Sequence, residues 1–140
     1  MLLAPVFILA SAAVVGLLGC LHLFFTFHGN RFDPRDAALT AALAVTSPVI
    51  TEQTTMARAA KGFHASHSMG VMLFALVWGY LALAQWTVLR QLPLLLVLGM
   101  VVLLTYLLLA KRYWFSVPLR GIALANALYA AGLVLALLAV

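Results

Sequence analysis

The chain has 140 residues, of which 66% are hydrophobic and 8% are charged, and its formal net charge is +5. A soluble globular domain has about 45–50% apolar and about 25% charged residues. Eight Lys and Arg and three Asp and Glu residues cannot cover the surface of a water-soluble domain of this length. The composition therefore predicts an integral membrane protein and excludes a disordered chain, a disulfide scaffold and a conventional nucleic-acid-binding protein. The single cysteine, Cys20, excludes an internal disulfide and a Cys-based zinc site.

Four apolar runs are long enough to cross a bilayer, which requires about 20 residues per helix. They cover residues 2–27, about 63–85, about 92–110 and about 117–140. Because no water reaches the bilayer core, the backbone must form its own hydrogen bonds, and each run is expected to be a helix. The first run has no basic residue before it and is longer than a signal-peptide core, so we expect a true span. The expected fold is an all-α, single-domain bundle of four spanning helices over residues 1–140.

Basic residues are unevenly distributed between the loops. Only Arg90 lies in the short second loop, whereas the other seven lie in or beside the first and third loops: Arg31, Arg35, Arg58, Lys61, Lys111, Arg112 and Arg120. Lys and Arg are enriched in cytoplasmic loops. The first and third loops are therefore expected to be cytoplasmic, with both termini and the second loop outside.

The first loop, residues 28–62, is expected to be structured and to lie at the membrane interface. Pro34 prevents the first helix from continuing, and residues Ala37–Val45 predict a short helix. Ser47-Pro48 is typical of a helix start, and a helix from this point is expected to run into the second span.

Charged side chains are concentrated in this loop. They include Arg31, Asp33, Arg35, Asp36 and Glu52. Two roles remain open for them. They form a salt-bridge cluster that fixes the short helix, or they form a polar lid or headgroup clamp, since Arg can bind a carboxylate or phosphate at two points.

Small residues at a spacing of four are typical of helices that pack closely in lipid. The first span has Ala12, Gly16 and Cys20, the second has Gly62, Ser66 and Gly70, and the fourth has Gly121 and Ala125. These three helices are expected to form the packed core. The leucine-rich third span is expected to be the most exposed to lipid.

Polar side chains within the apolar runs fall at similar depths, and intramembrane polar residues usually face the bundle interior or a wet cavity. Phe74 and Trp78 share one face of the second span with His64 and His67, at spacings of three and four residues. We take this layer as the candidate ligand-binding site. Its members are His22, His64, His67, Phe74, Trp78, Tyr106 and Asn126.

Three kinds of chemistry are open to the histidines. In the first, they form structural hydrogen bonds across helices. In the second, they ligate a metal or haem, since neutral imidazole is a common metal ligand. In the second case His22, His64 and His67 share one divalent ion, or His22 and His67 hold one haem from two sides. In the third, the layer carries proton chemistry or recognises an amphipathic molecule such as a quinone or a lipid, with Phe74 and Trp78 against its apolar body. No Gly-x-Ser-x-Gly element supports covalent catalysis, and the sequence leaves enzymatic activity and the cofactor undetermined.

Three segments carry a resemblance to a known group. They are Gly19-Cys20-Leu21-His22 with Thr26-Phe27, Arg31-Phe32-Asp33-Pro34-Arg35-Asp36 and Gly62-Phe63-His64-Ala65-Ser66-His67-Ser68-Met69-Gly70. This pattern is similar to a group of small bacterial four-span membrane proteins, loosely DoxX-like, in which a Gly-Phe-Asn-x-Ser-His-Ser-x-Gly stretch is typical. The resemblance covers most of residues 16–80 and implies a four-helix bundle in the bacterial cytoplasmic membrane. It also implies that His22, His67 and the first loop matter more than His64, which stands where Asn is expected, and it implies no reaction.

Two classes of function remain. In one, the histidine layer binds or acts on a lipid-like or quinone-like molecule. In the other, the chain is a structural or accessory subunit that packs beside a larger membrane partner. The expected partners are membrane lipids, a second copy of the chain or a larger complex.

Overall fold

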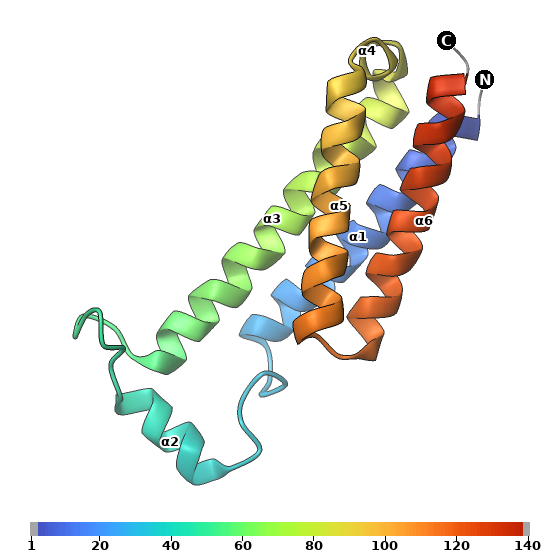
Figure 1. Cartoon of the computed structure of the whole chain (residues 1–140). Coiled ribbons are helices and arrows are strands. Elements are labelled where there is room, and N and C mark those ends of the chain that lie inside the picture. The colour runs from blue at the N-terminus through green and yellow to red at the C-terminus, as the bar shows by residue number, and fades with distance from the viewer. Residues whose placement is uncertain (1–2, 139–140) are drawn as a thin grey trace. The chain divides into compact units, whose positions relative to one another are not determined.

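The computed structural model describes residues 3–138 of the chain (Figure 1). This part of the chain forms six helices and contains no strand. Four helices are long and apolar enough to cross a membrane: α1 (Leu3–Phe27), α3 (Met56–Ala84), α5 (Pro93–Tyr113) and α6 (Ser116–Leu138). Two are short, α2 (Ala37–Val45) and α4 (Trp86–Gln91). The predicted all-α fold with four spanning helices is confirmed. Position 2 of the first predicted span and positions 139–140 of the last lie outside the described residues.

The sequence predicted a helix start at the Ser47-Pro48 pair. This prediction is wrong, because helix α3 begins at Met56. The carbonyl of Pro48 instead accepts a hydrogen bond from the N–H of Thr51 at 3.2 Å, which closes a turn. The hydroxyl of Thr51 then accepts from the N–H of Gln53 at 3.1 Å. Local bonds of this kind compete with helix formation, so the Ser- and Thr-rich segment between α2 and α3 is not helical.

Two further boundaries differ from the expectation. The short second loop contains α4, a helix that the hydrophobic pattern did not predict. Helix α5 continues to Tyr113, so that Lys111 and Arg112 form its last turn. Cations at this end interact favourably with the helix dipole, which favours a helix that continues past residue 110, where the predicted span ended.

The chain divides into two compact units. Unit 1 is Met1–Leu18 with Val71–Val140, and unit 2 is Gly19–Gly70. Because both boundaries fall inside helices, α1 and α3 each contribute one part to each unit.

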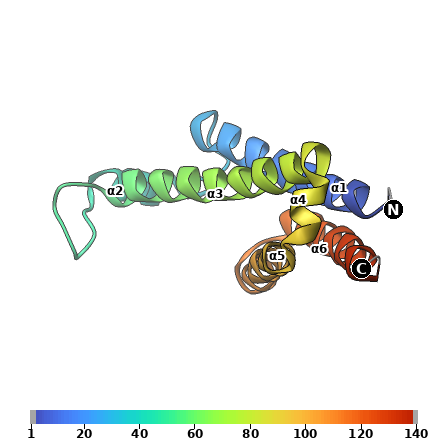
Figure 2. The same cartoon turned by 90° about the horizontal axis from the view of Figure 1, so that it is seen from above.

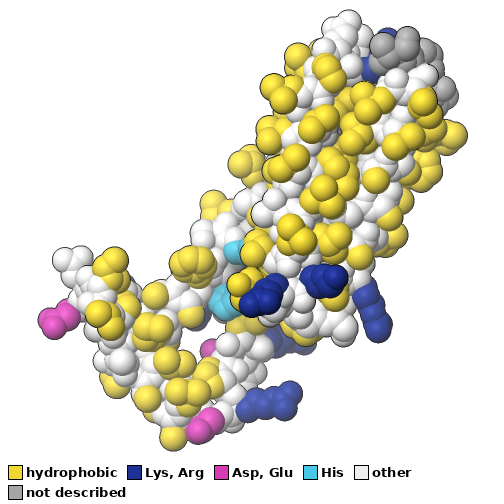
Figure 3. All heavy atoms as spheres, in the orientation of Figure 1, with side chains coloured by type: hydrophobic (Ala, Val, Ile, Leu, Met, Phe, Trp, Pro, Cys, Tyr) yellow, Lys and Arg dark blue, Asp and Glu magenta, His cyan; other side chains and the backbone are white. Residues whose placement is uncertain are grey.

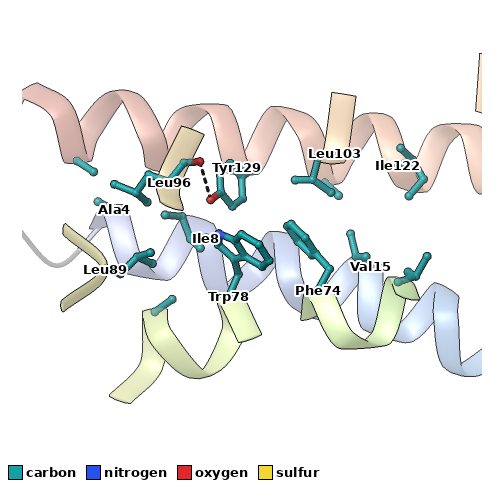
Figure 4. Close-up of a cluster of buried hydrophobic side chains, with 14 residues drawn as sticks. Ala4, Ile8, Val15, Phe74, Trp78, Leu89, Leu96, Leu103, Ile122 and Tyr129 are labelled. Atoms are coloured by element: carbon teal, nitrogen blue, oxygen red, sulfur yellow. Dashed lines mark hydrogen bonds between the residues drawn. The ribbon is translucent and has the colours of Figure 1, made fainter. Parts of the chain in front are cut away.

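Unit 1 is a bundle of four helices, in which α5 and α6 lie side by side (Figures 1 and 2). Its core is a cluster of buried side chains to which α1, α3, α5 and α6 all contribute, and these side chains point toward one another in Figure 4. Tyr129 is fully buried there, and its hydroxyl donates a hydrogen bond to the carbonyl of Leu96 at 3.0 Å. The indole N–H of Trp78 donates to the carbonyl of Leu95 at 3.2 Å. These bonds satisfy polar groups that lipid would leave without partners.

Glycine allows α1 and α6 to approach closely in this bundle. A Cβ atom on Gly132 would lie 2.7 Å from Cγ1 of Ile8 and 3.0 Å from the carbonyl oxygen of Ala4. Gly16 of α1 lies similarly close to Ala75 of α3. Gly16, and likewise Gly121 of α6, whose added Cβ would lie 2.7 Å from Cδ1 of Leu18, therefore lie at contacts between helices, as predicted from their spacing.

The small residues of the second span do not follow that prediction. Gly62, Ser66 and Gly70 are exposed, and a Cβ on Gly62 would meet no atom within 4 Å. Cys20 of the first span is exposed as well. A spacing of four defines one face of a helix, but it does not determine whether that face meets another helix.

The face of α5 and α6 seen in Figure 3 carries hydrophobic side chains along its length, and basic side chains gather at the α5–α6 turn. Of the four long helices, α5 has the smallest buried share. Its exposed side chains include Leu94, Leu98, Leu104 and Leu108. The third span is therefore the most exposed one, as expected.

Unit 2 consists of the end of α1, the first loop with α2, and the first half of α3. Helix α2 has the predicted bounds. Its N-terminal N–H groups are capped by the carboxylate of Asp36, which accepts from Ala38 at 2.8 Å and from Leu39 at 3.4 Å. Such a cap satisfies backbone donors that have no partner within the helix.

Candidate functional site

Three of the four histidines meet in unit 2. His22 is on α1, and His64 and His67 lie three residues apart on α3, a spacing that places both on one helix face. Nε2 of His22 lies 3.1 Å from Nδ1 of His64, within hydrogen-bond distance. The ring centroid of His22 lies 5.2 Å from that of His64 and 5.4 Å from that of His67. We call these three residues the histidine cluster.

Two hydroxyl side chains bond to the backbone of the cluster. Thr26 donates to the carbonyl of His22 at 2.8 Å, and Ser68 donates to the carbonyl of His64 at 2.8 Å. Both hydroxyl residues are buried and lie four positions after their histidine. A hydroxyl that bonds to the carbonyl four residues earlier often bends a helix slightly. This repeated His-x-x-x-Thr/Ser spacing is a sequence signal that the analysis of single polar residues missed.

Phe32 of the first loop covers two of the imidazoles. Its ring stacks on His64 with 4.7 Å between centroids and 15° between planes, and its centroid lies 4.5 Å from that of His22. The neighbouring Arg31 lies over the ring of Phe25, with 3.9 Å between Cζ and the ring centroid. The first loop thus contributes an apolar cover and a cation–π contact, neither of which the sequence pattern had indicated.

A cavity of about 240 Å³ lies beside the histidine cluster, within unit 2. The end of α1, the first loop, α2 and the start of α3 line it, and it is partly open to the surroundings. Its apolar wall includes Phe25, Phe32, Pro34, Leu43, Ala57 and Ala60. Its polar side chains are Thr26, Asp33, Thr40, Arg58, Lys61 and His64. We call this space the loop cavity.

Several polar side chains of the loop cavity are already hydrogen bonded within the protein. Thr26 donates to His22, Thr40 donates to the carbonyl of Asp36 at 3.0 Å, and His64 bonds to His22. In the described part of the chain, Arg58 and Lys61 form no ion pair. Their charges are therefore available to a molecule in the cavity.

The charged residues of the first loop have different positions. Arg31, Asp33, Arg35, Asp36 and Glu52 form no ion pair among residues 3–138, so the salt-bridge cluster considered from the sequence is not present. Asp36 caps α2, Arg31 covers Phe25, and Asp33 lines the loop cavity. Arg35 and Glu52 are exposed and do not line the cavity.

The metal and haem hypotheses for His22, His64 and His67 stay predictions. No group of three or more His, Cys, Asp or Glu side chains within the described residues has the arrangement of metal ligands. His22 and His64 direct ring nitrogens at one another, and the rings of His22 and His67 meet edge to face at 72°.

The other predicted site residues belong to unit 1. Phe74 and Trp78 stack at 4.6 Å between centroids and are buried in the core (Figure 4). Asn126 is also buried, and its amide donates to the carbonyls of Leu103 and Ile122. Tyr106 is half-buried, with its ring centroid 6.3 Å from that of Trp114. These contacts give Phe74, Trp78 and Asn126 a packing role within unit 1, and their participation in a ligand site stays a prediction.

Comparison of the chain with protein-family models, curated proteins and solved structures gives no match. The likeness to DoxX-like proteins stays a prediction. The function is therefore argued from the geometry of the site.

Proposed function

We propose that the loop cavity binds the polar end of an amphipathic, lipid-like or quinone-like molecule, in a protein embedded in the bacterial cytoplasmic membrane. The observation that carries this proposal is a cavity with aromatic walls that borders His64 of the histidine cluster. Pockets for drug-sized ligands have volumes of about 300–1,000 Å³. At about 240 Å³, the loop cavity fits a headgroup better than a whole lipid. The apolar chain of the ligand would then extend beyond it.

His64 provides a polar contact for such a headgroup. Each ring nitrogen of a neutral imidazole can form one hydrogen bond, as a donor or as an acceptor. Nδ1 of His64 faces His22. The second nitrogen, Nε2, is therefore the atom that we assign to a hydroxyl or carbonyl group of the ligand, and His22 fixes the orientation of the ring.

We place the cavity on the cytoplasmic side of the membrane, with both termini outside. The support is the charge distribution, since basic residues are enriched on the cytoplasmic side. Seven of the eight lie in the first loop, residues 28–62, or in the helix ends that flank the α5–α6 turn. A reporter that is active only in the cytoplasm, fused to the C-terminus, should be inactive. Activity of that fusion would contradict the orientation and leave the cavity itself unaffected.

Photo-crosslinking tests the binding site. The purified protein in phosphatidylcholine nanodiscs is irradiated with a diazirine-bearing hexadecanol, and the modified peptides are identified by mass spectrometry. We expect adducts within residues 25–64, and we expect His64→Ala to lower their yield several-fold. His28→Ala is the matched control, because His28 is exposed and does not line the cavity.

Three results would contradict the proposal. They are adducts spread evenly over the spanning helices, equal yields from both histidine variants, and obligate co-purification with a larger subunit that covers the loop. The last result would favour the accessory-subunit alternative. A visible absorption spectrum and metal analysis of the same sample should show no Soret band and no stoichiometric metal.

A further inference from the structure

We propose that the headgroup bound in the loop cavity is an anion, a lipid phosphate or carboxylate, and that Arg58 and Lys61 hold it. This inference rests on the proposed function and names the chemical class of its ligand. It depends on a second observation, which is that the two basic side chains in the cavity wall form no ion pair within residues 3–138.

Arg58 and Lys61 lie three residues apart on α3, so their side chains leave the same face of the helix. Both line the loop cavity. Neither has a carboxylate partner among residues 3–138. Two adjacent cations without an ion-pair partner favour an anionic ligand, because the attraction of each cation to a negative charge between them outweighs their mutual repulsion.

The remaining polar groups of the cavity do not compete for this role. The Thr26 and Thr40 hydroxyls donate to backbone carbonyls of the protein. Asp33 is the one carboxylate among the described residues that line the cavity. Two cations against one carboxylate leave the wall with a charge of +1, so an anion is favoured over a neutral or cationic headgroup.

The two cations differ in geometry, and together they suit an oxyanion. The planar Arg guanidinium can donate two parallel hydrogen bonds to a carboxylate or phosphate, and Lys acts as a compact point charge. A phosphate monoester carries about −1.5 to −2 charges near neutral pH. We therefore expect a phosphate to bind more tightly than a carboxylate with the same chain.

Competition against the photo-crosslinking reaction tests the inference. The labelling probe is the neutral diazirine-bearing hexadecanol, and the competitors are dodecyl phosphate, dodecanoic acid, dodecanol and inorganic phosphate. We expect dodecyl phosphate to compete about tenfold better than dodecanol, with dodecanoic acid between them and inorganic phosphate without effect. In the Arg58→Gln/Lys61→Gln double variant, phosphate and alcohol should compete equally.

Lys111→Gln/Arg112→Gln is the matched control, since it removes the same charge from the end of α5 and should leave the preference for phosphate unchanged. Equal competition by dodecyl phosphate and dodecanol in the unmodified protein would overturn the inference, and the binding site would still stand. Competition by inorganic phosphate as strong as that of dodecyl phosphate would also overturn it, in favour of a soluble anion. Absence of labelling in residues 25–64 by the neutral probe would refute the proposed function itself.

Discussion

The imidazoles of His22 and His64 face each other across two helices, with Nε2 of one 3.1 Å from Nδ1 of the other. Neither residue is fully buried, and Phe32 covers both rings. One nitrogen must donate and the other must accept, so this contact requires at least one neutral ring. The pair thus links the end of α1 to the start of α3 through a polar contact inside unit 2.

Replacement of His22 by alanine should destabilise unit 2 by about 1 kcal/mol, the usual net effect of one hydrogen bond. His64→Ala should have a similar effect. The free energy of unfolding of the double variant should fall by less than the sum of the two single changes, because both remove the same bond. Thermal unfolding in detergent measures all three. His28→Ala is the control, with an expected change within about 0.5 kcal/mol because the side chain is exposed. Strict additivity of the two single variants would mean that the pair forms no bond in solution.

Gly132 offers a direct test of the contact between α1 and α6. In Gly132→Ala the new methyl group would collide with Ile8 and with the backbone oxygen of Ala4, which cannot rotate away. Overpacking of this kind costs about 1–3 kcal/mol. Gly62→Ala is the matched control, because it makes the same change in a long helix, α3, where the new methyl group would meet no atom within 4 Å. It should stabilise α3 by up to about 1 kcal/mol, since alanine favours helices. Equal effects of the two changes would contradict the packing of α6 on α1.

The buried hydroxyl of Tyr129 bonds to the carbonyl of Leu96 in α5. Tyr129→Phe keeps the ring and removes only this bond, so the free energy of unfolding should fall by about 1 kcal/mol. Tyr80→Phe is the control, because Tyr80 is 59% exposed and its hydroxyl should add little to stability. A thermal shift no larger for Tyr129→Phe than for Tyr80→Phe would show that the bond is not formed.

Helix α2 depends on its cap. Asp36→Ala should weaken the helix by about 1 kcal/mol, and hydrogen exchange should become faster at the amides of residues 38–45. Glu52→Ala removes the same charge from an exposed position of the same loop and should leave these amides unchanged. Faster exchange in both variants would instead point to a general effect of loop charge.

The sequence predicted the helices correctly wherever hydropathy and the residues that start or stop a helix indicated the same bounds. Helix α2 has the bounds that were predicted after Pro34, and the structure adds the Asp36 cap. The spanning helices follow from hydropathy alone. Helix α4 escaped prediction because its six residues carry no periodic pattern of useful length. The Ser47-Pro48 signal failed because side-chain bonds within the following turn compete with a helix.

The site was only partly accessible. Matching depths in consecutive spans brought His22 and His67 together correctly, and the shared helix face added His64. Phe32, by contrast, reaches the imidazoles only through the path of the loop, for which the sequence has no periodic signal. The same is true of the loop cavity, which four separate segments line.

Asn126 provides the last test, because its amide is only half satisfied. The amide nitrogen donates to the carbonyls of Leu103 and Ile122, while the buried oxygen Oδ1 has no partner. A buried acceptor without a donor costs about 1–3 kcal/mol, which offsets what the two donated bonds contribute. Asn126→Leu keeps the number and branching of the side-chain heavy atoms and should therefore change the free energy of unfolding by less than about 1 kcal/mol. Asn126→Ala should cost more, because it also leaves a cavity beside Leu103 and Ile122. Thermal unfolding of both variants in detergent separates the effect of removing the amide from the effect of the cavity. A loss well above about 1 kcal/mol for Asn126→Leu would contradict this and would mean that Oδ1 accepts a hydrogen bond in the membrane, which would support Asn126 as a ligand-binding candidate.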